Sequence, residues 1–200
     1  GGDTASAERV YRDAPPARFF NGLVAEVVAA AAQAHRGTKP LRVLEIGAGT
    51  GGTTAHVLPR LAPGSAHYTF TDVGNAFVTR ARERFGGAAV ATAFQVFDLE
   101  HDGAAQGLAD GAHDLVIASN VVHATRDLRA SLRRIHRLLA PGGLLVMLEA
   151  CAPQAWFDVT VGLTEGWWAF EDRDLRPDYP TLSRTAWLAL LEQEGFAAEA

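Results

Sequence analysis

A glycine-rich turn that follows an apolar run is the feature that most constrains the fold of this chain. The run Val43-Leu44-Glu45-Ile46 leads directly into Gly47-Ala48-Gly49-Thr50-Gly51-Gly52, and a helical pattern follows from about Thr53 to Leu61. This order predicts a buried strand, a tight loop and a helix N-terminus. Glycines let backbone N–H groups approach a ligand closely, and a helix N-terminus favours polar or anionic atoms. The turn therefore predicts a site for a nucleotide-type cofactor.

Two cofactors compete for this turn. Gly47, Gly49 and Gly52 spell G-x-G-x-x-G, and Asp72 follows Gly52 by 20 positions (72 − 52 = 20), which is typical of dinucleotide binding. Glu45 favours a different ligand, because a carboxylate beside the turn repels a pyrophosphate and attracts an ammonium group. S-adenosylmethionine (SAM) carries an ammonium group and no phosphate. We therefore favour SAM, with a nicotinamide-dependent dehydrogenase as the alternative.

The rest of the chain alternates short apolar runs with helical patterns. We expect strands at Leu41–Ile46, Tyr68–Thr71, Val90–Phe97, His113–Ser119 and Leu144–Glu149, and helices at Arg18–Ala34, Ala76–Phe85, Arg126–Leu139 and Leu182–Glu194. Such alternation predicts right-handed crossovers and an α/β fold, in which helices cover both faces of a mostly parallel sheet. Residues 1–40 are predicted to form an N-terminal arm and a helix, with Pro15 and Pro16 as breakers. Residues 41–200 are predicted to form the cofactor-binding core.

Composition excludes several classes of function. The formal net charge of −5 argues against a nucleic-acid-binding surface. The single cysteine, Cys151, cannot form a disulfide within the chain, and no apolar run reaches the length of a membrane span. No spacing of Cys, His and Asp residues suggests a metal site. These features favour a cytoplasmic globular enzyme without a metal ion.

Polar residues stand where the predicted strands end. Asp72, Asp98, Asn120 and Glu149 each come at or just after such an end. Ligands of parallel α/β sheets bind beyond the carboxyl ends of the strands. We therefore expect these residues to share one crevice, where the carboxylate of Asp72 can accept both ribose hydroxyls of the cofactor in charge-assisted hydrogen bonds.

Several motifs carry a resemblance to a known family. The sequence L-E-I-G-A-G-T-G resembles the first motif of class I SAM-dependent methyltransferases. The narrower motifs are D-L-V-I-A-S-N-V-V-H-A-T at Asp114–Thr125, L-L-A-P-G-G-L-L-V-M-L-E at Leu138–Glu149, G-L-T-E-G-W-W at Gly162–Trp168 and D-L-R-P-D-Y-P-T-L at Asp174–Leu182. They resemble the methyltransferase domain of modular type I polyketide synthases, which implies a Rossmann-like class I methyltransferase fold. A full fold of this class ends with two further strands, and this sequence stops where the first of them would begin. The expectation is therefore either an incomplete domain or a sheet that lacks its last strands.

The resemblance also implies roles for the cofactor-binding residues. Glu45, Gly47 and Gly49 would surround the methionine end of SAM, with Glu45 acting through backbone N–H groups and water near the ammonium. Asp98 would contact the adenine amino group, and the backbone N–H of Leu99 would read a ring nitrogen. Asn120 would face the methionine moiety.

A histidine and a glutamate are candidates for the catalytic chemistry. His123 comes shortly after the fourth predicted strand and Glu149 ends the fifth. Neighbouring strands lie about 4.8 Å apart, so both side chains can reach one crevice. A carboxylate beside an imidazole fixes its tautomer and stabilises the imidazolium. In the family that the chain resembles, a His and a Glu at the matching positions form the catalytic dyad, so we predict His123 as general base and Glu149 as its orienter.

The resemblance implies a substrate, and two alternatives stay open. The expected reaction is C-methylation at the α-carbon of a β-ketoacyl thioester on an acyl carrier protein, among neighbouring polyketide synthase domains. O-methylation of a β-hydroxyl or enol is the first alternative, and an inactive scaffold is the second. Only about 40 residues precede the first strand, whereas carbon methyltransferases of these synthases usually carry a large helical lid there. The aromatic residues Trp156, Phe157, Trp167, Trp168 and Phe170 would either line an acyl channel or fill core.

Overall fold

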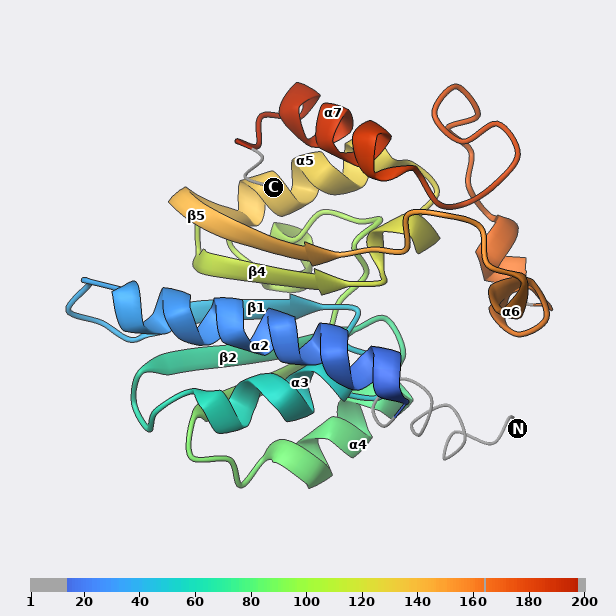
Figure 1. Cartoon of the computed structure of the whole chain (residues 1–200). Coiled ribbons are helices and arrows are strands. Elements are labelled where there is room, and N and C mark those ends of the chain that lie inside the picture. Colours follow the sequence, from blue (N-terminus) through green and yellow to red (C-terminus); the bar gives the residue numbers. More distant parts are fainter. Residues whose placement is uncertain (1–13, 164, 198–200) are drawn as a thin grey trace.

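A parallel sheet separates two layers of helices in the computed structural model, which describes residues 14–163 and 165–197 (Figure 1). The sheet has five strands in the order β3-β2-β1-β4-β5. They are β1 (Leu41–Ile46), β2 (Ala66–Asp72), β3 (Ala91–Val96), β4 (His113–Ser119) and β5 (Leu139–Leu148). This order places the sequence reversal between β1 and β4, where ligands of such sheets bind. The predicted Rossmann-like fold is confirmed.

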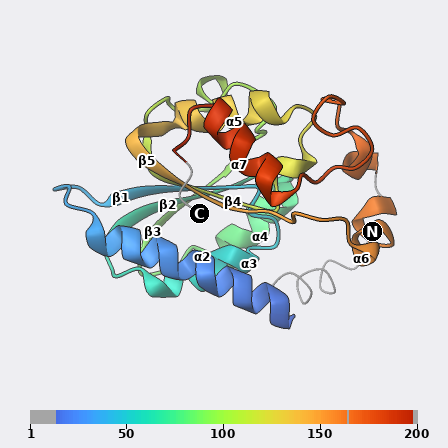
Figure 2. The same cartoon turned by 45° about the horizontal axis from the view of Figure 1, so that its top comes forward.

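The helices lie on both faces, as the alternating pattern predicted. They are α2 (Pro15–Ala34), α3 (Gly52–Val57), α4 (Asn75–Phe85), α5 (Leu128–Leu138), α6 (Ala155–Asp158) and α7 (Arg184–Gln193). Short 3₁₀ turns are η2 (Leu58–Arg60), η3 (Ala104–Gln106), η4 (Val122–Ala124), η5 (Val161–Leu163) and η6 (Glu165–Trp168). Both views show α2, α3 and α4 on one face and α5 and α7 on the other (Figure 2).

Alternate residues of the central strands point into two hydrophobic cores, one on each face of the sheet. In β1, Val43 packs toward the layer of α2, α3 and α4, whereas Leu44 packs toward α5 and α7. In β4, Leu115 and Val116 divide in the same way. All four side chains are fully buried, which explains why these strands read as continuous apolar runs.

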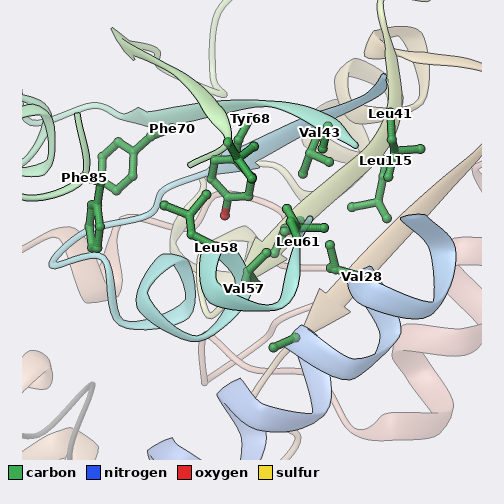
Figure 3. Packing of buried hydrophobic residues seen from close by; sticks show 14 of the residues in the cluster. Val28, Leu41, Val43, Val57, Leu58, Leu61, Tyr68, Phe70, Phe85 and Leu115 are labelled. Carbon is green, nitrogen blue, oxygen red and sulfur yellow. The ribbon is translucent and has the colours of Figure 1, made fainter. Parts of the chain in front are cut away.

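The core beneath α2, α3 and α4 is built on aromatic residues of β2. Tyr68 and Phe70 are fully buried there among apolar side chains of the three helices, and Val57 and Phe85 are two of these (Figure 3). Val28 of α2 joins the same cluster, so α2 packs on the sheet as part of the core layer. The predicted division between residues 40 and 41 stays a prediction.

Several predicted boundaries were wrong. Pro15 and Pro16 do not break the chain: they occupy the first turn of α2, where the N–H that proline lacks has no helical partner anyway. The helix after the glycine turn narrows to a 3₁₀ turn at Leu58, because Pro59 has no N–H to continue the helical bonds. Ser183 caps the last helix, since its side chain accepts from the Ala186 N–H.

The last strand also begins earlier than predicted. Pro141-Gly142-Gly143 was expected to separate helix from strand, yet β5 already starts at Leu139, which pairs with His113. The strand accommodates the interruption through a register shift between His113 and Leu115, and Gly142 adopts a positive φ of 75°. An irregularity of this kind tolerates proline, which a regular ladder does not.

The described part of the chain has no strand after α7. The same residues contain no helix with the length and apolar character needed to cross a membrane.

Candidate active site

The glycine turn after β1 forms the floor of the candidate site. Gly47, Gly49 and Gly51 have φ values of 60°, 55° and 73°, which side chains rarely adopt. A Cβ on Gly47 would lie 2.2 Å from Cγ2 of Val121, which follows β4. Only glycine therefore lets the turn approach the β4 loop this closely.

Asp72 ties the end of β2 to this turn. Its carboxylate is buried and accepts the Gly49 N–H at 2.9 Å and the Gly74 N–H at 2.7 Å. A carboxylate has about four acceptor positions, so lone pairs remain for further donors. The residue thus fits the predicted pair of ribose hydroxyls.

Glu45 is part of the core instead of the crevice surface. Only 1% of this residue is exposed, and its Oε2 accepts from the Thr54 hydroxyl at 2.5 Å and from the Tyr68 hydroxyl at 2.6 Å. Burial raises the pKa of this carboxyl to about 7, although the bonds from Thr54 and Tyr68 act in the opposite direction. The side chain therefore joins β1 to β2 and α3, and any influence on the ammonium of SAM would pass through neighbouring backbone groups.

Asp98 follows β3 in a hydrogen-bonded loop. Its Oδ1 accepts the Glu100 N–H at 2.8 Å, and its Oδ2 lies 2.9 Å from Nδ1 of His101. Gln106 holds the Asp98 backbone on both sides, since it accepts the Asp98 N–H at 2.8 Å and donates to the Asp98 carbonyl at 2.9 Å. Leu99 is buried next to it. The sequence pattern did not single out Gln106, because its role depends on a turn eight residues away.

Asn120 reverses the chain after β4. Its φ of 51° is the one positive value among the non-glycine residues that the structure describes, and asparagine tolerates this region better than most residues. Its N–H donates to the Leu148 carbonyl of β5 at 2.7 Å. The reversal carries the chain from the strand into η4, where His123 lies.

His123 and Glu149 meet as predicted. Nδ1 of His123 lies 2.5 Å from Oε2 of Glu149, and the two side chains are almost fully buried. Glu149 Oε1 accepts the N–H groups of Val121 and Val122 at 3.1 and 2.8 Å. An ionised carboxylate only accepts, so Nδ1 carries the proton in the neutral ring and Nε2 keeps a free lone pair. The pair has the geometry of a general base and its orienter.

The aromatic segment after β5 contains both buried and exposed rings. Phe157, Trp167 and Phe170 are buried, whereas Trp156 and Trp168 are exposed by 44% and 43%. The Trp167 ring packs edge-on against His123, with 5.2 Å between ring centroids. This segment projects beyond the carboxyl ends of β4 and β5, beside the candidate site (Figure 1).

Sequence reasoning missed a buried ion pair behind His123. Arg176 and Asp172 lie in the loop before α7, and their side chains are 0% and 4% exposed. The signal in the sequence is the i, i+4 spacing of the two charges in the run Asp172-Arg173-Asp174-Leu175-Arg176. Nothing in the local pattern indicated that these charges leave the surface.

Comparison with known proteins agrees with this geometry. The glycine turn, the acidic strand ends and the parallel sheet fit a SAM-dependent methyltransferase, and the comparisons show that the chain is of this class. A family described as "Methyltransferase domain" matches residues 44–145, and the chain belongs to this family.

Relatives and solved structures narrow the comparison. Polyketide synthase ThaG of Burkholderia thailandensis is 45% identical over 200 residues, which cover 98% of this chain and 4% of ThaG. The CurJ carbon methyltransferase structure has a TM-score of 0.94 at 42% identity, covering 98% of this chain and 52% of that one. The trans-methyltransferase CalH, solved in complex with SAH, has a TM-score of 0.76 at 34% identity, covering 94% and 54%. The chain thus spans a small part of this curated relative and about half of the two solved structures.

Proposed function

We propose that this chain methylates the α-carbon of a β-ketoacyl thioester carried on an acyl carrier protein, with His123 as general base. The observation that carries the proposal is the buried pair of His123 and Glu149, directly beyond the glycine turn. The similarity to the CurJ carbon methyltransferase supports the choice of carbon as the methyl acceptor.

The pair suits the proposed chemistry. An α-carbon between a ketone and a thioester is acidic enough for an imidazole to remove its proton when the enolate is stabilised. Nε2 of His123 accepts this proton, and the carboxylate of Glu149 stabilises the imidazolium that results. When bound, SAM supplies an electrophilic methyl group on a sulfonium, which leaves as a neutral thioether. A positioned base of this kind contributes roughly 10²–10⁴-fold to the rate.

The residues around the glycine turn fit SAM. We assign the ribose hydroxyls to Asp72, the adenine to Asp98 and the N–H of Leu99, and the methionine moiety to Asn120. The backbone of Gly47 and Gly49 supports the same end of the cofactor, and Glu45 braces the turn from below through Thr54. The fit rests on the free lone pairs of Asp72 and on a turn that no Cβ obstructs.

We further propose that the acyl carrier protein and neighbouring polyketide synthase domains are the partners, in the cytoplasm. The support is that ThaG and PksR of Bacillus subtilis are polyketide synthases of which this chain matches 4% and 8%. The exposed rings of Trp156 and Trp168 offer an apolar approach for an acyl chain.

One experiment tests the proposal against its alternatives. The protein is incubated with SAM and either a β-ketoacyl or a β-hydroxyacyl pantetheine thioester, and tandem mass spectrometry locates any added methyl group. A methyl group on the α-carbon of the ketone is the expected result. A methyl group on oxygen would make the protein an O-methyltransferase. SAM binding without methylation of either thioester would indicate an inactive scaffold.

A further inference from the structure

A buried arginine clamps the loop that carries His123. The Nη1 of Arg176 donates to the His123 carbonyl at 2.7 Å, and Nη2 donates to the carbonyls of Thr125 and Arg126 at 2.8 and 3.0 Å. These three carbonyls lie in η4 or just after it, where a short helical turn leaves acceptors without a helical donor. Arg176 therefore supplies the donors that hold this turn in place.

The guanidinium is saturated. Its Nε donates to Asp172 Oδ1 at 2.6 Å, and the remaining Nη1 bond goes to the Pro180 carbonyl at 3.5 Å. Together with the three loop carbonyls, these bonds engage all five N–H donors of the arginine. A buried charge is tolerated when it is paired and fully hydrogen-bonded, and removing one partner is strongly destabilising.

Asp172 extends the clamp to the next helix. Its Oδ2 accepts the N–H of Leu128, the first residue of α5, at 2.9 Å. The backbone N–H of Glu171 donates to the Arg126 carbonyl at 2.8 Å. The loop of residues 171–176 is thus fastened to both ends of the connection between η4 and α5.

His123 is consequently fixed from three directions. Glu149 holds Nδ1, Trp167 packs edge-on against the ring, and Arg176 holds the backbone carbonyl. Trp167 and Arg176 belong to one continuous segment after β5, so the segment that flanks the crevice also carries the support of the base. Errors of about 1 Å in the placement of a catalytic group can cost on the order of 10²-fold in rate.

We propose that Arg176, with Asp172 as its counter-ion, is a positioning residue that aligns His123 for proton abstraction. The inference rests on the proposed function of His123 as general base. It predicts that a change at Arg176 impairs the base step while the cofactor site keeps its affinity, because the hydrogen bonds of Arg176 go to none of the proposed cofactor-binding residues.

The test compares Arg176→Lys with Arg173→Lys. Lysine keeps the charge but loses the planar fork, so it cannot reach Asp172 and three loop carbonyls together. Arg173 lies in the same segment, is exposed and donates to Pro177, so it is the matched control. Two readouts are used: kcat and KM for methylation of a β-ketoacyl pantetheine thioester, and exchange of its α-proton in D2O without SAM, corrected for buffer-catalysed exchange. The stoichiometry of SAM binding counts the folded sites, and the SAM dissociation constant reports on the cofactor site.

We expect Arg176→Lys to lower kcat and the exchange rate at least tenfold per SAM-binding site, with KM and the SAM dissociation constant within threefold. Arg173→Lys should match the wild type. Wild-type rates in Arg176→Lys would overturn the positioning role while the function stands. A wild-type protein that neither exchanges nor methylates the thioester would instead overturn the proposed function.

A second variant covers the case in which Arg176→Lys does not fold. The double substitution Asp172→Asn with Arg176→Gln replaces the ion pair by a neutral amide pair, which removes the penalty of an unpaired buried charge. A glutamine side chain offers two donors where arginine offers five, so most of the loop carbonyls lose their partner. We expect SAM binding to persist and proton exchange to fall at least tenfold. Unchanged exchange in this variant would also refute the proposal.

Discussion

At the scale of single residues, Glu149 has two roles, and each of its two carboxylate oxygens carries one of them. Oε1 accepts the N–H groups of Val121 and Val122 and so shapes the turn, whereas Oε2 contacts Nδ1 of His123. Loss of the whole side chain would disturb both. Substitutions that change one oxygen at a time therefore tell the catalytic role from the structural one.

Replacing His123 by alanine should abolish most turnover and leave SAM binding intact. Nδ1 of the ring contacts Glu149, so Nε2 carries the lone pair that accepts the proton. A positioned base of this kind contributes roughly 10²–10⁴-fold to the rate. We expect kcat to fall within that range, measured by methyl transfer, while calorimetry gives an unchanged SAM dissociation constant. His67→Ala is the control, because His67 is exposed at the start of β2, and the site lies beyond the carboxyl ends of the strands. Full activity in His123→Ala would sink the assignment.

Glu149→Gln should retain the turn but weaken the base. The amide oxygen can still accept from Val121 and Val122, whereas the amide NH2 cannot accept from Nδ1–H of His123. The lost charged hydrogen bond is worth about 1.5–3 kcal/mol, which predicts a roughly tenfold to hundredfold lower kcat. Steady-state kinetics measures the loss and thermal unfolding checks the fold. A variant as fast as the wild type would show that His123 needs no orienter.

Asp72→Ala should weaken SAM binding at least tenfold, about 1.4 kcal/mol. The substitution removes the carboxylate proposed to bind the ribose, and it frees the N–H groups of Gly49 and Gly74. Titration calorimetry measures the dissociation constant, and Asp110→Ala, at an exposed position, serves as control. If Asp72→Ala bound SAM with wild-type affinity, Asp72 would have no place in the cofactor site.

At the scale of elements, the local sequence pattern predicted the bounds of a strand correctly where these bounds do not depend on a distant partner. The strands at Leu41–Ile46 and His113–Ser119 have the predicted bounds, because both are buried on two faces and flanked by polar or glycine residues. The start of β5 was missed, since Leu139 becomes a strand residue only through its pairing with His113. Burial by a distant partner leaves no periodic signal.

The same distinction holds for the site. His123 and Glu149 were predictable because both follow neighbouring strands, and the topology of the sheet brings such ends together. Arg176 was not, because its burial depends on a loop that folds back over η4, some 50 residues earlier in the chain. Sequence reasoning thus located the proposed base and its orienter, and it missed the residues that support them.

Glu45 couples three elements, and this coupling should make stability depend on pH. It lies on β1 and accepts from Thr54 of α3 and Tyr68 of β2. Its pKa is about 7 in the folded chain against an ordinary value of 4.5. Between these two values the folded state binds a proton that the unfolded state releases, so stability falls as pH rises. The contribution is full below pH 4.5, and the loss above pH 7 is roughly 3 kcal/mol.

Glu45→Gln should remove this dependence, because an amide does not ionise. The free energy of unfolding, measured with urea from pH 4.5 to pH 8, is expected to decline more steeply in the wild type than in the variant. Glu83→Gln, which changes an exposed carboxylate of α4, should follow the wild-type curve. Parallel curves for the wild type and Glu45→Gln would contradict the assignment.

At the scale of the whole molecule, the crevice lies where the two halves of the sheet meet. The glycine turn comes from β1 and the turn with Val121 comes from β4, and the sequence order reverses between these strands. A ligand that contacts both turns bridges the half with β1, β2 and β3 to the half with β4 and β5. Its binding should therefore stabilise the molecule as one cooperative unit.

Gly47→Ala tests this bridge. SAM at a hundred times its dissociation constant should stabilise the wild type by about 2.7 kcal/mol, which corresponds to a rise in Tm of roughly 5–10 °C for a chain of this size. A Cβ at Gly47 would lie 2.2 Å from Val121 Cγ2, so the two turns must separate and the rise should vanish. Gly64→Ala is the matched control: its φ of 74° brings the same backbone strain, about 1–2 kcal/mol, but no atom lies within 4 Å of the new Cβ. It should melt earlier than the wild type and still gain the full rise with SAM. If Gly47→Ala also gained the full rise in Tm, the contact of its Cβ with Val121 would have no effect on SAM binding. The cofactor would then lie away from the glycine turn.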